Sequence, residues 1–127
     1  MQQLELGGRR GVVADQGLVA VTAQTQETIL VLNPPAYGGT APNGTIDATG
    51  LLSTGSGKTL ELWLPPAGVT NGCLAPGSGT KLGTLTTGLL GSWRFNKTPV
   101  AAPITRGVST VYFYAPQFGG CNSQTVK

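Results

Sequence analysis

The sequence contains no histidine, and its charged residues amount to only eight basic and five acidic side chains. Histidine is the commonest metal ligand and the side chain best suited to proton transfer near neutral pH. Without it, the serines have no imidazole base, and the two cysteines alone cannot complete a closed zinc site. The carboxylates show no spacing that marks a catalytic pair. We therefore predict a protein that is not an enzyme and uses no metal or other cofactor.

Charged residues make up 10% of the chain, against about 25% in ordinary soluble domains. Threonine, serine, asparagine, glutamine and glycine must cover the surface instead, and such a surface is poorly protected against association. The net charge of +3 comes from scattered residues rather than from a basic patch with interleaved aromatics. These features favour contact with other protein subunits and do not indicate nucleic-acid binding or a small-molecule ligand.

No hydrophobic run approaches the length of about eighteen residues that a membrane helix needs, and the first ten residues do not resemble a secretion signal. We expect synthesis in a cytoplasm and no membrane association. The two cysteines, Cys73 and Cys121, allow two interpretations. A disulfide would close a loop of about 50 residues and stabilise the fold by about 4 kcal/mol, whereas a reducing cytoplasm would keep both thiols free.

Short alternating apolar stretches, separated by glycine and proline, predict an all-β chain of one domain over residues 1–127. The stronger candidate strands are 18–22, 28–32, 59–64, 81–86, 92–95 and 108–114, and the weaker ones are 12–13 and 45–48. This spacing is typical of a β-sandwich. Eight strands would suit a jelly roll and seven an immunoglobulin-like sandwich, and the sequence leaves both open.

Two long Gly/Pro-rich stretches, residues 33–44 and 65–80, are predicted to be loops that leave the sheets. Asn33-Pro34-Pro35 is expected to end the strand before it, and Pro65-Pro66 the run 59–64. Residues 1–10 and 116–127 are predicted to be terminal arms. In the first arm, Leu4 and Leu6 alternate with polar residues as in an added strand, so we predict that both contact a partner.

Residues 53–59, Ser-Thr-Gly-Ser-Gly-Lys-Thr, resemble the phosphate-binding loop of nucleotide hydrolases. The position of the first glycine holds Leu52 instead, and a strand rather than a helix is expected after the loop. No aspartate follows a later strand to hold magnesium. We therefore interpret this stretch as a glycine-rich hairpin turn.

Trp63 is the best candidate for an exposed or interfacial aromatic ring. The leucines of run 59–64 share one face of the expected strand, and Glu61 and Trp63 share the other. The other aromatic residues also fall in strand runs, where large rings fill a core or a subunit interface.

Small size, an all-β pattern, a neutral Gly/Thr-rich surface, long loops and terminal arms together resemble the small decoration, or cement, proteins of tailed-phage heads. The resemblance implies a virion structural protein on the capsid surface that binds the major capsid protein, often as a trimer. Arg9 and Arg10 would then contact acidic patches on the shell. The alternative is a carbohydrate-binding or adhesive β-sandwich of a fibre or appendage, with Trp63 in the sugar site.

Overall fold

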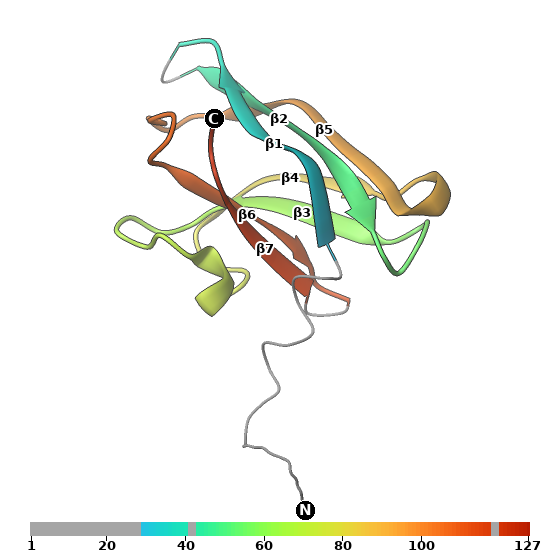
Figure 1. Ribbon diagram of the computed structural model, residues 1–127. Helices are drawn as coiled ribbons and strands as arrows, with labels where there is room; N and C mark the ends of the chain where they lie inside the picture. Colours follow the sequence, from blue (N-terminus) through green and yellow to red (C-terminus); the bar gives the residue numbers. More distant parts are fainter. Residues whose placement is uncertain (1–28, 41–42, 118–119) are drawn as a thin grey trace, which may run out of the picture.

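The computed structural model describes residues 29–40, 43–117 and 120–127. Within these ranges the chain forms seven strands in two antiparallel sheets, which pack face to face as a sandwich (Figure 1). The predicted all-β sandwich is therefore confirmed. In the described part of the chain, no helix has the length and apolar character needed to cross a membrane.

The two sheets differ in size and contain strands from alternating parts of the chain. The three-stranded sheet has the order β1 (Ile29–Gly38), β2 (Gly44–Leu52), β5 (Ser92–Val100). The four-stranded sheet has the order β4 (Thr80–Thr86), β3 (Thr59–Leu64), β6 (Thr110–Ala115), β7 (Gly120–Thr125). Two short 3-10 turns, η2 (Gly72–Leu74) and η3 (Leu89–Gly91), lie in the connections. Over the described residues, this order matches a seven-stranded immunoglobulin-like domain in which the fourth strand pairs with the third instead of the fifth.

Strict alternation of side chains places the core between the sheets. Along β2, Ile46, Ala48, Gly50 and Leu52 are buried, and the residues that alternate with them are partly exposed. Along β3, Leu60 and Leu62 are buried and Glu61 and Trp63 point to the other face, as predicted.

The centre of the core consists of aromatic rings from both sheets. Trp93 and Phe95 of β5 lie 4.9 Å and 6.0 Å from Phe113 of β6, measured between ring centroids. Gly50 of β2 lies opposite Trp93, and a Cβ there would come within 2.4 Å of the indole. Large rings on one strand therefore require a residue without a side chain on its neighbour.

The prediction of a loop over residues 33–44 is wrong for most of that stretch. β1 continues through Pro34 and Pro35 to Gly38, and β2 already begins at Gly44. The prolines are tolerated because β1 is an edge strand and the register shifts between Asn33 and Ala36. Within the shifted stretch, the carbonyl of Pro35 accepts a hydrogen bond from the amide of Lys127.

The prediction of a C-terminal arm over residues 116–127 is also wrong, because residues 120–125 form β7 and pair with β6 of the same chain. Val126 is fully buried, and the Lys127 carbonyl accepts a hydrogen bond from the Tyr37 amide. Lys127 thus connects the end of β7, in the four-stranded sheet, to β1 in the three-stranded sheet through hydrogen bonds. The predicted arm 1–10 and the candidate strands 12–13 and 18–22 lie outside the described residues.

Residues 53–58 do not form a hairpin turn. They connect β2 of one sheet to β3 of the other, so the hairpin prediction is wrong, although the strand expected after the loop is present. The predicted loop over residues 65–80 is confirmed up to residue 79, and β3 ends at Leu64, directly before Pro65-Pro66.

Candidate interaction surface

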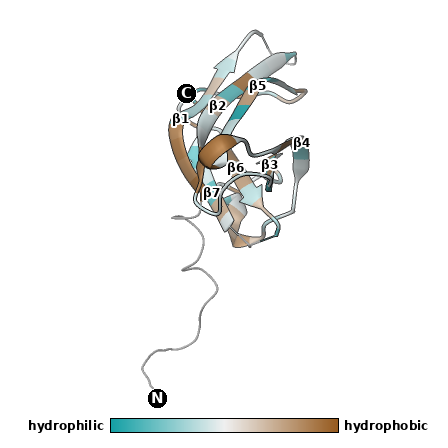
Figure 2. Cartoon of the chain, turned by 90° about the vertical axis from the view of Figure 1, so that its right-hand side faces the viewer, coloured by the Kyte–Doolittle hydropathy of each residue, from teal (hydrophilic) through white to brown (hydrophobic). Residues whose placement is uncertain are grey.

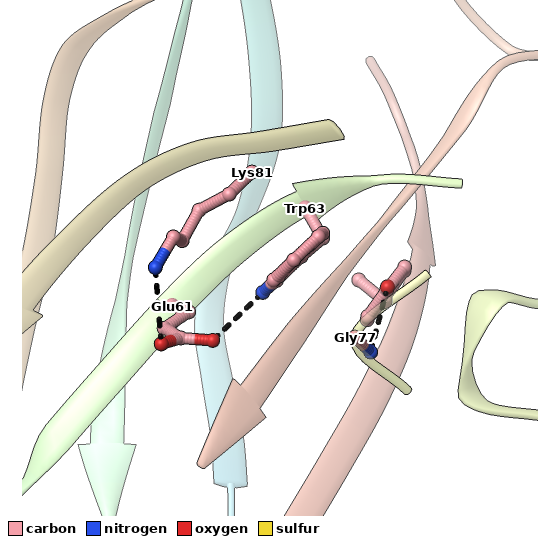
Figure 3. A network of polar contacts seen from close by, with 5 residues as sticks. Glu61, Trp63, Gly77 and Lys81 are labelled. Atoms are coloured by element: carbon pink, nitrogen blue, oxygen red, sulfur yellow. Dashed lines mark hydrogen bonds and ion pairs between the residues drawn. The ribbon is translucent and has the colours of Figure 1, made fainter. Parts of the chain in front are cut away.

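The outer face of the four-stranded sheet carries a cluster of aromatic and charged side chains. Trp63 lies between two neighbours: the ring of Tyr112 stacks at 6.1 Å and 10°, and Lys81 Nζ lies 5.9 Å from the indole centroid. Glu61 accepts a hydrogen bond of 2.9 Å from Trp63 Nε1 and forms an ion pair of 3.5 Å with Lys81 (Figure 3). Both faces of the Trp63 ring therefore have an intramolecular neighbour.

The electrostatic part of this cluster is weak. The Lys81 side chain is 47% exposed and that of Glu61 is 14% exposed, so water screens the pair. Exposed ion pairs contribute about 0–1 kcal/mol. The cluster thus fixes the orientation of Trp63 more than it stabilises the fold.

The loop of residues 65–79 covers part of this face and is held in three ways. A disulfide joins Cys73 in η2 to Cys121 in β7. Of the two interpretations of the cysteines, the structure therefore has the disulfide and not the free thiols. Tyr112 Oη donates a hydrogen bond to the Ser78 carbonyl and accepts one of 3.1 Å from the Gly77 amide. Thr110 Oγ1 donates to the Thr70 carbonyl at 2.8 Å.

Tyr112 is the buried anchor of the loop. Its side chain is fully buried, and a Cβ on Gly72 would lie 2.0 Å from its ring. Burial raises the pKa of Tyr112 above 10.0, although the hydrogen bond from Gly77 works in the opposite direction. The hydroxyl therefore remains a neutral donor in the folded state.

Large apolar side chains are exposed elsewhere, chiefly at one end of the three-stranded sheet. Leu30 and Leu32 of β1 are 51% and 55% exposed, and Leu89 and Leu90 of η3 are both 81% exposed. Leu30 pairs with the half-buried Leu51 of β2, which pairs with Ser92, the residue directly after η3. We call Leu30, Leu32, Leu51, Leu89 and Leu90 the leucine face. Figure 2 looks onto this end and shows η3 and the first half of β1 as hydrophobic.

The other exposed apolar side chains are single residues in loops: Val69, Leu74 and Val108. Leu74 is 82% exposed and belongs to the loop that covers the four-stranded sheet. Single exposed apolar residues are common on proteins, whereas a cluster of them marks an interaction site. The leucine face is therefore the best candidate interaction surface among the described residues.

The sequence predicted only part of this arrangement. Trp63 lies on the outer face as expected but is half-buried by its neighbours, and its predicted contact with a partner stays a prediction. Leu4, Leu6, Arg9 and Arg10 lie outside the described residues. The leucine face was missed, although a leucine pair between Gly88 and Gly91 is a signal that an apolar turn could be exposed.

The described residues do not bring together a pair of carboxylates or a group of potential metal ligands. Asp47 lies on the outer side of the three-stranded sheet and Glu61 on the outer side of the other sheet, so these two carboxylates point away from each other. No group of three or more potential metal ligands occurs in the ranges that the structure covers.

In the loop that resembles a phosphate-binding motif, backbone amides donate hydrogen bonds to other groups of the same chain. The amides of Gly55 and Gly57 donate to the carbonyls of Leu52 and Thr87, and the Lys58 amide donates to Thr87 Oγ1. A phosphate-binding loop needs such amides to point at its ligand. Here the Gly55 amide closes a local turn, and the amides of Gly57 and Lys58 join two connections between the sheets.

No protein-family model matches the chain, and comparison with curated proteins and with solved structures also finds no match.

Proposed function

We propose that this protein is a structural subunit that acts through protein–protein contact, in the manner of a capsid decoration protein on the surface of a phage head. The observation that carries the proposal is the leucine face, in which four of the five leucines are each at least half exposed, at one end of a domain with very few charges. Such a surface is stabilised when a neighbour covers it.

The free energies expected for burial and for association indicate that the leucine face needs further contacts to hold the protein on the shell. Burying these four side chains contributes roughly 1–2 kcal/mol each, whereas association costs at least about 4 kcal/mol in lost freedom of motion. A stable interface also buries about 800 Å² on each partner. The proposal therefore includes further contacts to the shell, from the segment 1–10 or from a trimer that binds several sites at once.

The experiment is a binding measurement with head particles assembled without this chain. We expect saturable co-sedimentation of the purified protein with the heads, at a fixed ratio to the major capsid protein. Absence of co-sedimentation at high protein concentration would contradict the proposal.

The contribution of residues 1–10 has its own test. Deleting them should lower binding sharply and leave the circular dichroism spectrum unchanged, since the seven strands are formed by residues 29–125. Unchanged occupancy on the heads would show that this segment is not a contact.

The sugar-binding alternative has less support, because Trp63 is half-buried between Tyr112 and Lys81, which leaves less of its ring for a sugar to stack on. A glycan array with wild type and Trp63→Ala distinguishes the two functions. Strong sugar binding that Trp63→Ala abolishes would favour the alternative.

A further inference from the structure

We infer that the leucine face docks on a protein surface that combines an apolar depression with carboxylates, and that Arg94 makes the charged contact. The inference rests on the proposed function and specifies the chemistry of the partner surface. Its evidence is the placement of Arg94, the charges around it and the backbone of Leu90.

Arg94 lies on the same outer face as the leucines. Leu30, Leu51 and Ser92 form one cross-strand row, and Asn33, Thr49 and Arg94 form the next. Leu32 is the additional residue at the register shift beside Asn33. Because Leu89 and Leu90 lie in η3, which ends one residue before Ser92, the apolar side chains and the guanidinium can contact one partner surface.

The charge on this face is positive and incompletely compensated. Arg94 is exposed and has no carboxylate partner among the described residues. Asp47, the carboxylate of this sheet, accepts a hydrogen bond of 2.9 Å from the Lys97 amide, and Glu61 is paired on the opposite sheet. A carboxylate-bearing partner would pair with the exposed Arg94, whereas a second copy docking through this face would bring a second Arg94 and, among the described residues of this face, the single carboxylate of Asp47, which is less complementary in charge.

The backbone conformation of Leu90 is further evidence for a contact at the leucine face. Leu90 has φ 58° and ψ 22°, a left-handed conformation that is unfavourable for leucine and is usually taken by glycine or asparagine. Its side chain is 81% exposed, so little packing within the domain compensates for the strain. Strained residues of this kind cluster at functional sites. Contact of the Leu90 side chain with a partner protein explains why leucine occupies this strained position.

A membrane surface is the less favoured occupant. Adsorption to anionic lipid depends on several basic residues close together. The rows next to the leucine pair contain only one, Arg94. Leu30, Leu32 and Leu51 also belong to the sheet face, which suits a broad protein surface.

The test measures the affinity of variants for heads that lack the chain, using the full protein. Leu89→Ser/Leu90→Asn removes both apolar groups from η3, and Leu74→Ser is the control, a leucine of similar exposure in the loop that covers the other sheet. We expect the double variant to bind at least about tenfold more weakly and Leu74→Ser to bind within about twofold of wild type. Asparagine tolerates positive φ, so the single variant Leu90→Asn should melt no lower than wild type and still bind more weakly.

Arg94 is tested by charge reversal. Arg94→Glu should weaken binding and reduce its dependence on salt, whereas Lys127→Glu, a reversal at the chain end, should change neither. Equal binding of Arg94→Glu and wild type at low salt would overturn the charged contact.

Failure of the inference and failure of the proposed function give different results. If wild type binds heads and the leucine variants bind equally well, the inference is overturned and the function stands. If wild type does not bind heads, the function falls, and the inference falls with it. Light scattering that shows self-association lost in the double variant, or binding to phosphatidylcholine/phosphatidylglycerol vesicles lost in it, would assign the face to another occupant.

Discussion

Gly50 faces the interior of the sandwich at a position where a methyl group does not fit. A Cβ there would lie 2.0 Å from the Leu30 carbonyl oxygen and 2.4 Å from the Trp93 ring. The first contact is with backbone of the neighbouring strand, which cannot move without disturbing the β1–β2 pairing. The requirement for glycine is therefore steric.

We expect Gly50→Ala to lower the free energy of unfolding by roughly 1–3 kcal/mol, measured by denaturant titration. The matched control is Gly38→Ala in the same sheet, where the added Cβ would find its nearest neighbour, Thr45 Oγ1, at 3.7 Å. Equal stability of the two variants would contradict this account of the core.

The buried hydroxyl of Tyr112 predicts a pH dependence. Below pH 10 the side chain is neutral in both states. Above it, the unfolded chain ionises first because burial raises the pKa in the folded state. The free energy of unfolding should therefore fall as the pH rises from 10 through the folded pKa.

Tyr112→Phe should lack this alkaline loss and cost about 1 kcal/mol at neutral pH, because two hydrogen bonds to the loop disappear. Tyr114→Phe is the control on the same strand, since its hydroxyl has no hydrogen bond among the described residues. An unchanged alkaline slope in Tyr112→Phe would show that another group is responsible.

At the scale of elements, the loop of residues 65–79 is a cover attached to the four-stranded sheet. The Cys73–Cys121 bridge spans 48 residues of sequence, so the chain-entropy model gives it about 4 kcal/mol. Cys73→Ala/Cys121→Ala should lower stability by up to that amount and increase amide exchange in residues 70–78. The same variant should leave head binding intact, because the leucine face belongs to the other sheet. Loss of head binding in this variant would place the contact on the covered face.

Some elements were predictable from local pattern. β3 was predicted because Leu60 and Leu62 alternate with Glu61 and Trp63, and Pro65 directly follows the strand. β1 was predicted too short, because a local view cannot show that Pro34 and Pro35 fall on a sheet edge with a register shift. The same reason explains the error at residues 53–58: a glycine-rich turn looks alike whether it joins two strands of one sheet or of two sheets.

The candidate site was less predictable than the fold. The sequence identified Trp63 as an outward residue, but its neighbours Tyr112 and Lys81 come from strands that only the sheet order brings together. The leucine face is formed by two strands and one turn, so no single window of sequence contains it. The scarcity of charge predicted that such a surface should exist without locating it.

At the scale of the whole molecule, we propose that the isolated protein self-associates, with a trimer expected. Light scattering during size-exclusion chromatography measures the mass directly and should give three times 12.9 kDa. Because the account places the leucine face against the shell and not between subunits, Leu89→Ser/Leu90→Asn should leave this mass unchanged. A stable monomer at high concentration would contradict the trimer.

The central claim is that the chain is a shell-bound subunit whose leucine face lies against the shell. Cryo-electron microscopy of heads reconstituted with the purified protein tests this most directly. The account predicts density for the sandwich at repeated lattice positions, with β1 and η3 toward the capsid protein and the loop of residues 65–79 away from it. Heads without such density, or density with the Trp63 side of the four-stranded sheet against the shell, would contradict it.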